Sequence, residues 1–401
     1  MLKVGSDFSG VGAFNQALIR LGKPYKEVFS CDMDKYARQT FIENYGEPEY
    51  YPTNVYDREI PSESLDIYMT SPPCQAFSLA GNRLGKDDKR GILFFNSYEF
   101  IQVNKPRFFI FENVKGLLSD DNGKTFSEWV NMLGGKSVNG VPVLFPYEES
   151  VPYHLYWKVL NAKEHGIPQN RERVFLIGIR DDSDNKFQFP KEEHLTKRLK
   201  DVLEENVEEK YFLSEKMVNG FTKHNENHNE KGTGFIFEPK DENDIANCLR
   251  ANAAICPTDN TIKIGDFRAD EGFRWREDNN SPTLCARARE DGSGQPVIKY
   301  NDKRLNDTIQ KNKLPIGEIK AIDTYNKKVQ GIAPTLTEPH HNTTRLWDGY
   351  KIRRLTPREC FRLMDFPNTF TWPVSDSQAY KQAGNSIVIN VLYKILKNLP
   401  L

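Results

Sequence analysis

The chain has 401 residues, a formal net charge of −1 at pH 7 and a pI of about 6.7. This balance excludes a protein whose whole surface is basic, so any contact with nucleic-acid phosphates must come from a local patch. The length is sufficient for two domains, each with a sizeable core of its own.

The cysteines argue against both a zinc site and a disulfide framework. There are six, with no Cys-x-x-Cys pair, and the histidines also lack the spacing of metal ligands. No secretory signal or membrane-length apolar run is apparent. We therefore expect a soluble protein of a reducing, cytoplasmic compartment, with no metal and no membrane. The cysteines are Cys31, Cys74, Cys248, Cys256, Cys285 and Cys360.

The N-terminal residues are typical of a nucleotide site. A short strand at 2–4 leads into a glycine turn with Gly10 and Gly12, and an amphipathic helix over 14–21 should end at Gly22. The spacing is not that of the dinucleotide motif, because Asn15 stands where a third glycine would be. A glycine turn alone is weak evidence, since many tight turns share it.

A second strand at 28–31 ends at Asp32, where an acidic side chain can accept hydrogen bonds from ribose hydroxyls. Together with the glycine turn, this residue favours a cofactor that contains adenosine. A helix should follow from Asp34, its N-cap, to Tyr45.

Two further strands end in reactive side chains. The apolar run 65–69 leads to Ser71-Pro72-Pro73 and then to Cys74, and the strand 108–111 leads to Glu112 and Asn113. Open α/β sheets build their ligand sites at the carboxyl ends of such strands. A thiol and a carboxyl group there predict a nucleophile with an acid beside it, against the alternative that Cys74 is an inert core residue.

The next elements complete an α/β pattern. Residues 80–91 are rich in glycine and charge and predict a loop, and a helix follows over 92–103. Strands are expected at 156–160 and 173–179, the second almost wholly apolar, as central strands are. The polar stretch Gln169–Arg173 precedes the second of them.

From about 181 to 350 the composition changes, which predicts a separate small domain, irregular and rich in β-structure. Residues 197–210 should form a helix and 219–234 a loop. Three similar short stretches, at 246–250, 281–285 and 333–337, represent either a weak repeat or chance. The region contains many arginines, the side chain suited to guanine edges and phosphates.

The C-terminal part returns to clear local signals. Thr356, Pro357 and Glu359 form a capping box with proline at the first helical position, which predicts a helix through Met364 that stops before Pro367. Residues 382–391 should open an apolar terminal helix, with a β-strand over 387–391 as the competing prediction.

The motif Pro73-Cys74-Gln75, followed by Glu112-Asn113-Val114, resembles the catalytic pair of the C5-cytosine DNA methyltransferases of bacterial restriction–modification type. The resemblance covers about residues 1–180 and 350–401. It implies a Rossmann-like, class I methyltransferase α/β fold for a catalytic domain of residues 1–180 and 351–401. Residues 181–350 would form the target-recognition domain.

The resemblance also implies the chemistry of the site. Cys74 would add to carbon 6 of a flipped-out cytosine, and Glu112 would hold its N3. Asn113 would hold the Pro73-Cys74 loop, and Gln169–Arg173 matches the block that places an arginine near the cytosine O2. The implied catalytic residues are Cys74, Glu112, Asn113, Arg171 and Arg173.

The implied cofactor is S-adenosylmethionine, with S-adenosylhomocysteine as product. Two departures from the family pattern weaken the assignment: Asn54 replaces a common acidic residue, and Ser6 stands where the family often has Asp, with Asp7 directly before Phe8. The implied cofactor contacts are Phe8, Gly10, Gly12, Asp32, Met33, Asn54, Val55, Pro73, Leu93, Asn385 and Ser386.

The implied substrate is double-stranded DNA with a specific short target. A monomer is expected, in the bacterial cytoplasm and associated with the nucleoid through DNA, and a separate cognate endonuclease is a candidate partner. The predicted DNA contacts are Ser78, Arg83, Lys86, Arg274, Arg287, Arg289 and Arg345.

Three alternatives remain open from the residues. The first is an RNA cytosine methyltransferase on the same scaffold, and the second is a non-catalytic DNA or cofactor binder. The third is a cysteine hydrolase, which would need a histidine beside Cys74; His154 and His165 are the candidates.

Overall fold

The computed structural model describes residues 1–73, 92–182, 185–214, 217–218, 220–225, 237–251, 259–264, 266–268, 272–274, 321–323, 328–330 and 351–401. Within these ranges, no helix is long and apolar enough to cross a membrane. The chain divides into two compact units. Unit 1 comprises Met1–Asn206, Glu242–Asn260 and Leu355–Leu401, and unit 2 comprises Val207–Asp241 and Thr261–Arg354.

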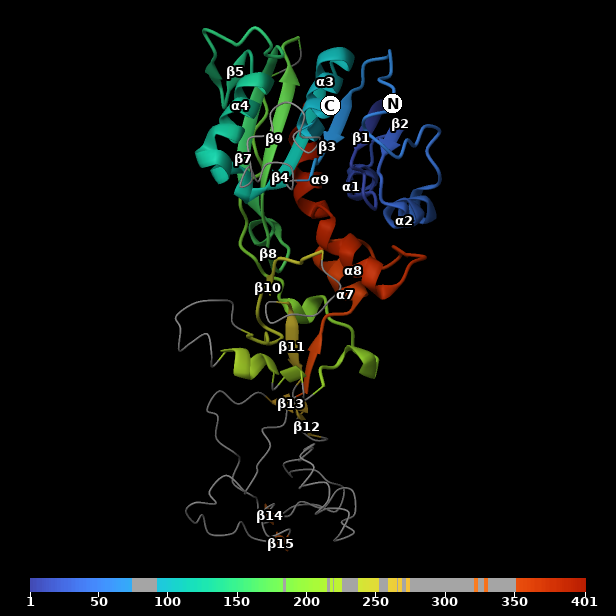
Figure 1. Cartoon of the computed structure of the whole chain (residues 1–401), viewed down its shortest axis with the longest axis vertical. Helices are drawn as coiled ribbons and strands as arrows, with labels where there is room; N and C mark the ends of the chain where they lie inside the picture. The colour runs from blue at the N-terminus through green and yellow to red at the C-terminus, as the bar shows by residue number, and fades with distance from the viewer. Residues whose placement is uncertain are drawn as a thin grey trace. The chain divides into compact units, whose positions relative to one another are not determined.

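Unit 1 is built on an eight-stranded sheet with the strand order β2-β1-β3-β4-β9-β7-β5-β6 (Figure 1). The neighbours from β2 to β4 run parallel, whereas β9 is antiparallel to both β4 and β7. The parallel strands end at a common edge, which is where the sequence places its functional side chains. The strands are β1 (Leu2–Asp7), β2 (Tyr25–Cys31), β3 (Ile67–Thr70), β4 (Phe108–Val114), β5 (Ser137–Val138), β6 (Val141–Pro142), β7 (Tyr153–Asn161) and β9 (Glu172–Arg180).

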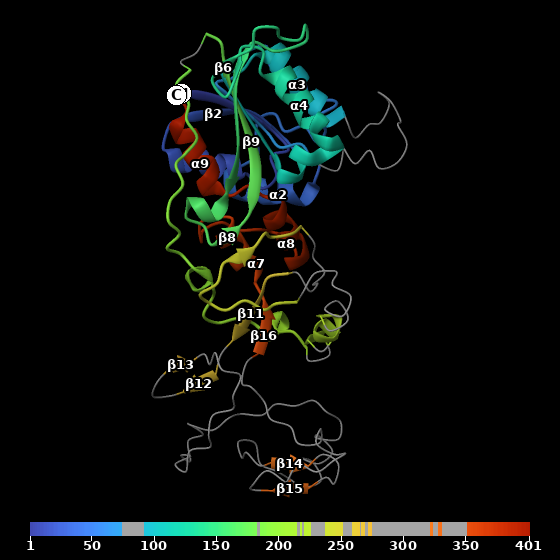
Figure 2. The same cartoon turned by 90° about the vertical axis from the view of Figure 1, so that its left-hand side faces the viewer.

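Helices cover both faces of this sheet, as the class of α/β fold predicts. Figure 2 shows α3 and α4 on one side of the sheet and α9 on the other, and α9 packs against α1. The helices of unit 1 are α1 (Ala13–Leu21), α2 (Lys35–Tyr45), α3 (Ile92–Asn104), α4 (Lys124–Leu133), α7 (Pro357–Leu363), α8 (Asp376–Asn385) and α9 (Ile389–Asn398). Segments of 3₁₀ helix lie at η2 (Lys115–Gly123), η3 (Ala162–His165) and η4 (Leu199–Asp201).

The core on the α3 side is aromatic. The rings of Tyr68 and Phe100 stack with centroids 4.1 Å apart, and those of Phe94 and Trp129 stack at 4.2 Å. These residues belong to one buried cluster with side chains of β2, β3, β4 and β7. Stacked aromatic pairs add to the free energy gained by burying their apolar area, so this cluster fixes α3 and α4 against the sheet.

The local signals for helix ends are confirmed. Gly22 ends α1 in the left-handed conformation at φ 71°, and the side chain of Asp34 accepts from the backbone N–H groups of Tyr36 and Ala37. Thr356 and Glu359 form the reciprocal capping box of α7, with a proline in the first turn. Each signal satisfies backbone groups that a helix end leaves free, which is why it could be recognised locally.

Three predictions of secondary structure were wrong. Residues 197–210 form no α-helix, because the N–H groups of Leu199 and Lys200 donate to the carbonyls of Asp244 and Glu242 instead of to their own turn. Residues 220–225, expected in a loop, are helical, and the ring of Phe221 packs on Phe237 there at 4.9 Å; residues 226–234 lie outside the described part.

The third error concerns the C-terminal helix. Residues 382–385 are the end of α8, Ser386 and Val388 are extended, and the terminal helix begins only at Ile389. The carbonyls of Gly384 and Ser386 both accept from Arg171. In an uninterrupted helix these carbonyls would instead accept from backbone N–H groups of the next turn. The competing β-strand over 387–391 is not formed either.

Unit 2 contains antiparallel strand pairs, in agreement with the predicted β-rich character. They are β11 (Thr261–Ile264) with β16 (Lys351–Arg354), β12 (Asp266–Arg268) with β13 (Gly272–Arg274), and β14 (Ala321–Asp323) with β15 (Lys328–Gln330). Unit 2 also contains the 3₁₀ turn η5 (Glu209–Tyr211).

Residues 242–260 lie between two parts of unit 2 in sequence, yet they belong to unit 1. Their strand β10 (Ala246–Asn247) pairs in parallel with β8 (Gln169–Asn170). The unit boundaries fall at 206/207, 241/242, 260/261 and 354/355. The sequence-based expectation had boundaries at 180/181 and 350/351 alone. The role of residues 181–350 in target recognition stays a prediction.

The capping box of α7 provides a test of this local account. Thr356→Ala should lower the free energy of unfolding of unit 1 by about 1–2 kcal/mol, because a buried cap hydrogen bond is lost. Ser375 is the matched control, since it caps α8 without a side-chain hydrogen bond, and Ser375→Ala should cost less than about 0.5 kcal/mol. Equal losses in urea unfolding of the two variants would contradict the account.

Candidate active site

The turn after β1 is shaped by residues in the left-handed region. Phe8, Gly10 and Gly12 have φ angles of 57°, 56° and 84°. A Cβ on Gly12 would lie 2.2 Å from Cε2 of Tyr45, so this position requires glycine for space as well as for conformation. At Gly10, by contrast, a Cβ would meet nothing within 4 Å, so open space lies beside that backbone.

Asp32 links this turn to the end of β2. One oxygen of its carboxylate accepts the Gly10 N–H at 2.7 Å and the other accepts the Asp34 N–H at 2.8 Å. The glycine turn and Asp32, which were predicted to form one adenosine site, are thus in direct contact. Each oxygen retains a lone pair, so the carboxylate can still accept from a hydroxyl group.

These residues fit a ligand that contains adenosine. The backbone at Gly10 can be approached closely, Asp32 is only half-buried, and the side chain of Met33 is 86% exposed beside it. Pro73 and Asn385 are also exposed. A ribose acceptor and an apolar side chain that is free to cover a base are the groups such a ligand needs.

The other predicted cofactor residues have structural roles in this state. Asn54 is bonded within its own turn, accepting from the Tyr56 N–H and donating to Asp57. Val55 is buried in the aromatic core cluster, and Phe8 and Leu93 pack against that cluster. Ser386 is buried, and its carbonyl accepts from Arg171.

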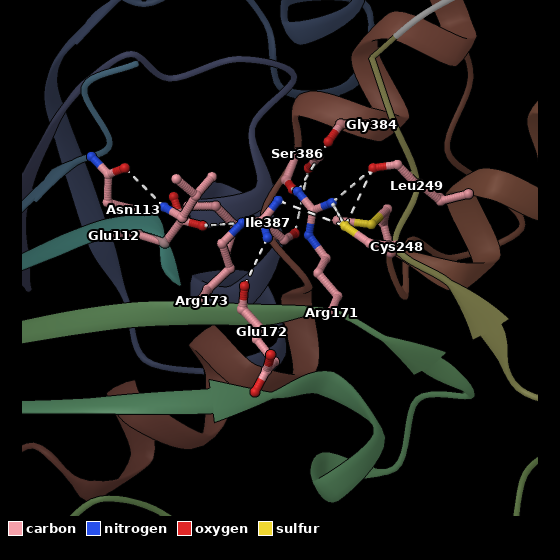
Figure 3. Close-up of polar contacts among 12 residues, drawn as sticks. Glu112, Asn113, Arg171, Glu172, Arg173, Cys248, Leu249, Gly384, Ser386 and Ile387 are labelled. Carbon is pink, nitrogen blue, oxygen red and sulfur yellow. Dashed lines mark hydrogen bonds and ion pairs between the residues drawn. The ribbon is translucent and has the colours of Figure 1, made fainter. Parts of the chain in front are cut away.

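Glu112 is the acidic group at the end of β4. It is only 7% exposed, and Nε of Arg173, on the neighbouring strand β9, lies 3.1 Å from its Oε1. Figure 3 shows the two side chains directed toward each other. Burial raises the pKa of Glu112 above its usual value, and the positive charges of Arg173 and Arg171 offset part of this increase.

Arg171 is buried and bonded to backbone rather than open to a substrate. Its Nη2 donates to the carbonyls of Gly384 and Ser386 at 2.9 and 2.7 Å, and its Nη1 donates to that of Leu249 at 3.2 Å (Figure 3). Burial, followed by the nearby charge of Arg173, lowers its pKa to about 10. These contacts favour a positioning role for Arg171 over the catalytic role expected from the sequence.

Asn113 connects the ends of β3 and β4. Its side-chain amide donates to the carbonyl of Pro72 at 3.1 Å, so the stretch before Cys74 is tied to the residue beside Glu112. The expected contact of Asn113 with the Pro73-Cys74 loop itself stays a prediction. Cys74 itself lies outside the described residues.

The predicted DNA contacts are largely beyond the described part of the chain. Arg274 ends strand β13 opposite Asp266, and only its backbone is described. The others, Ser78, Arg83, Lys86, Arg287, Arg289 and Arg345, lie outside the described residues.

Several contacts that reach the site from distant parts of the chain could not be predicted from the sequence. Gln169 donates to the Leu363 carbonyl and accepts from the Leu249 N–H, and the sulfur of Cys248 lies 3.3 Å from Nη1 of Arg171. Cys248 lies in 246–250, one of the three similar stretches that represent a weak repeat or chance. No local pattern there indicated that its side chain would contact Arg171. Among the described residues, no group of His, Cys, Asp and Glu could hold a metal ion.

Unit 1 has the α/β fold of the solved methyltransferase structures, with a mostly parallel sheet flanked by helices. Solved structures of the same fold include the S. pombe Dnmt2 methyltransferase, with a TM-score of 0.61 and 16% identity, covering 99% of this chain and 97% of that one. A mutant of DNMT2 from Spodoptera frugiperda gives a TM-score of 0.62 at 18% identity, with 99% of both chains covered. At these identities the likeness concerns the fold alone.

The sequence identifies the family. The model of the C-5 cytosine-specific DNA methylases matches residues 2–400, and the chain belongs to that family. The orphan methyltransferase M.SPRI of Bacillus phage SPR is 32% identical, covering 99% of this chain and 97% of its own. The type II methyltransferase M.HpaII of Haemophilus parainfluenzae is 31% identical, covering 98% and 88%.

The protein is accordingly a DNA (cytosine-5-)-methyltransferase that resembles those of restriction–modification systems. The family implies dependence on S-adenosylmethionine and DNA as the substrate.

The raised pKa of Glu112 predicts a pH-dependent effect of neutralising it. When a carboxyl group has a higher pKa folded than unfolded, the folded state loses stability as the pH rises through the folded pKa. Glu112→Gln removes this loss, so its free energy of unfolding relative to wild type should rise with pH from about 4 and then level off.

The control for this experiment is Glu172→Gln. Glu172 is a neighbouring, partly exposed carboxylate that pairs with Lys115 at the surface, so its replacement should change the free energy of unfolding by less than about 1 kcal/mol. If Glu112→Gln lost stability relative to wild type as the pH rose, the stated pKa direction would be wrong.

Proposed function

We propose that this chain methylates carbon 5 of a flipped-out cytosine within a specific short sequence of duplex DNA, through a covalent adduct to Cys74. The proposal rests chiefly on the ion pair between buried Glu112 and half-buried Arg173. The neighbouring residue, Asn113, bonds to the segment that leads into Cys74. A buried acid and a cysteine nucleophile are the groups that activation of a pyrimidine ring requires.

Cys74 is the proposed nucleophile. Its thiolate forms a bond to carbon 6 of the cytosine, and the electrons of the 5,6 double bond make carbon 5 nucleophilic. After carbon 5 has acquired the methyl group, a base removes its proton and the bond between sulfur and carbon 6 breaks. This step restores the 5,6 double bond and regenerates the thiolate, and the proton remains on the base.

Glu112 is the proposed partner of the cytosine N3. Its raised pKa keeps the carboxyl group protonated at a higher pH than an ordinary glutamate, so it can donate a hydrogen bond as negative charge develops on the ring. Arg173 fixes the orientation of this carboxyl group and is the arginine proposed to lie near the cytosine O2. Arg171 holds the backbone around them.

The cofactor is proposed to lie over the glycine turn. Phe8, Gly10 and Gly12 would shape the backbone beneath it, Asp32 would accept from the ribose, and Met33, Asn54 and Val55 would surround the adenine. When bound, S-adenosylmethionine supplies the sulfonium methyl group, the electrophile that carbon 5 needs. The remaining proposed contacts are Pro73, Leu93, Asn385 and Ser386.

DNA recognition is assigned to the region 181–350 and to the loop at 80–91. Because carbon 6 is inaccessible within a stacked duplex, the cytosine must leave the helix, and protein side chains must hold the partner strand. The proposed contacts are Ser78, Arg83, Lys86, Arg274, Arg287, Arg289 and Arg345. We further propose a monomer that acts in the bacterial cytoplasm at the nucleoid, with a cognate endonuclease working separately.

The nucleophile can be tested by trapping. A duplex with 5-fluorocytosine at the target has no carbon 5 proton to lose, so wild-type protein with S-adenosylmethionine should give a covalent complex visible by mass spectrometry. Cys74→Ala should form no complex and transfer no methyl group, because the attacking sulfur is gone. Cys360, a buried cysteine of α7, is the control, and Cys360→Ala should still form the complex.

A complex formed by the Cys74→Ala variant would remove Cys74 from the mechanism. Transfer to a folded RNA with none to duplex DNA would instead favour the RNA substrate left open by the sequence.

A further inference from the structure

A buried charged cluster includes Asp7, the last residue of β1, which directly precedes the glycine turn. The carboxylate of Asp7 accepts from Nε of Arg58 at 2.9 Å and from the hydroxyl of Tyr68 at 2.6 Å. The side chains of Asp7 and Arg58 are 0% and 2% exposed, and Tyr68 is fully buried. We refer to Asp7, Arg58 and Tyr68 as the buried anchor.

The surroundings of the buried anchor are aromatic. The guanidinium carbon of Arg58 lies 4.6 Å from the ring centre of Phe100 and 5.6 Å from that of Phe29. Burial lowers and the Asp7 carboxylate raises the pKa of Arg58, with a net increase. Removing two charges from water costs several kcal/mol per ion, so such a pair contributes little net stability compared with apolar side chains. The main effect of the Asp7–Arg58 pair is therefore to fix the relative positions of the segments it joins.

The buried anchor joins two segments of the proposed cofactor site. Asp7 is the last residue of β1, immediately before Phe8, and Arg58 closes the loop that contains Asn54 and Val55. The other end of that loop is held by the residue after β2 and by α2: the Asp32 N–H donates to the Pro52 carbonyl at 3.3 Å, and Arg38 donates to the same carbonyl at 3.1 Å. Between residue 52 and residue 58, the loop is thus fixed at both ends.

We propose that Asp7, Arg58 and Tyr68 are positioning residues for the cofactor: they hold the 52–58 loop against the glycine turn so that the adenine pocket exists before the ligand arrives. The inference rests on the cofactor site proposed above. None of the three residues touches the cofactor in this account. They act by ordering the 52–58 loop before binding. The entropy cost of ordering this loop is then not part of the binding free energy, and the affinity for the cofactor is higher.

The test replaces the buried anchor by an apolar equivalent. In the triple variant Asp7→Leu/Arg58→Met/Tyr68→Phe no charge or hydroxyl is left buried without a partner, so the thermal midpoint should stay close to that of wild type. The dissociation constant of S-adenosylhomocysteine, measured by calorimetry, should rise about tenfold because the loop is no longer held. The kcat at saturating S-adenosylmethionine should change far less than the KM for that cofactor.

Two single variants, each lacking one hydroxyl oxygen, provide the test if the triple variant does not fold. Tyr68→Phe removes one hydroxyl of the anchor, and Tyr153→Phe removes one of equal burial that donates to the Pro106 carbonyl. The first should weaken S-adenosylhomocysteine binding about threefold, whereas the second should leave it unchanged.

The outcomes separate the two proposals. A folded triple variant, or Tyr68→Phe, that binds S-adenosylhomocysteine with the wild-type dissociation constant would overturn the role of the anchor while leaving the cofactor site intact. Wild-type protein that binds no S-adenosylhomocysteine would overturn the cofactor site and, with it, the anchor.

Discussion

The hydrogen bonds of Arg171 hold together segments that lie far apart in the sequence. One guanidinium joins the start of β9 to Leu249 and to the linker between α8 and α9. Two residues further along, on strand β9, the side chain of Arg173 extends toward Glu112. Because Arg171 is buried and bonds to three backbone carbonyls and to the Cys248 sulfur, its loss would leave these segments without their common partner. The position of the acidic group in the site depends on this arrangement.

The same arrangement explains how a discontinuous unit can form one site. The parallel strands β1, β3 and β4 bring the glycine turn, the Ser71-Pro72-Pro73 stretch and Glu112 to one edge of the sheet. The C-terminal residues then pack as α9 against α1, and residues 242–260 return to pair with β8. The C-terminal residues and residues 242–260, although far from β1–β4 in sequence, therefore pack in the same unit as these strands.

The sequence could predict features whose cause is local. The cap of α2, the capping box of α7 and the contact between the glycine turn and Asp32 each arise from residues close in sequence or from a known βαβ pattern. The sequence could not predict the partners of Arg171, nor that Arg58 meets Asp7, because those contacts depend on how distant segments pack. The charge-rich stretch at 197–210 misled the prediction for the same reason, since its backbone pairs with residues 242 and 244.

The central claim is that this protein modifies cytosine in one short DNA sequence. It is tested most directly by base-resolution cytosine methylation of genomic DNA from a methylation-free bacterial host that expresses the chain. Our account predicts 5-methylcytosine at a single position of one short motif, and none when Cys74→Ala is expressed at the same level. Folded wild-type protein that leaves the genome unmethylated, or methylates cytosines regardless of their neighbours, would contradict it.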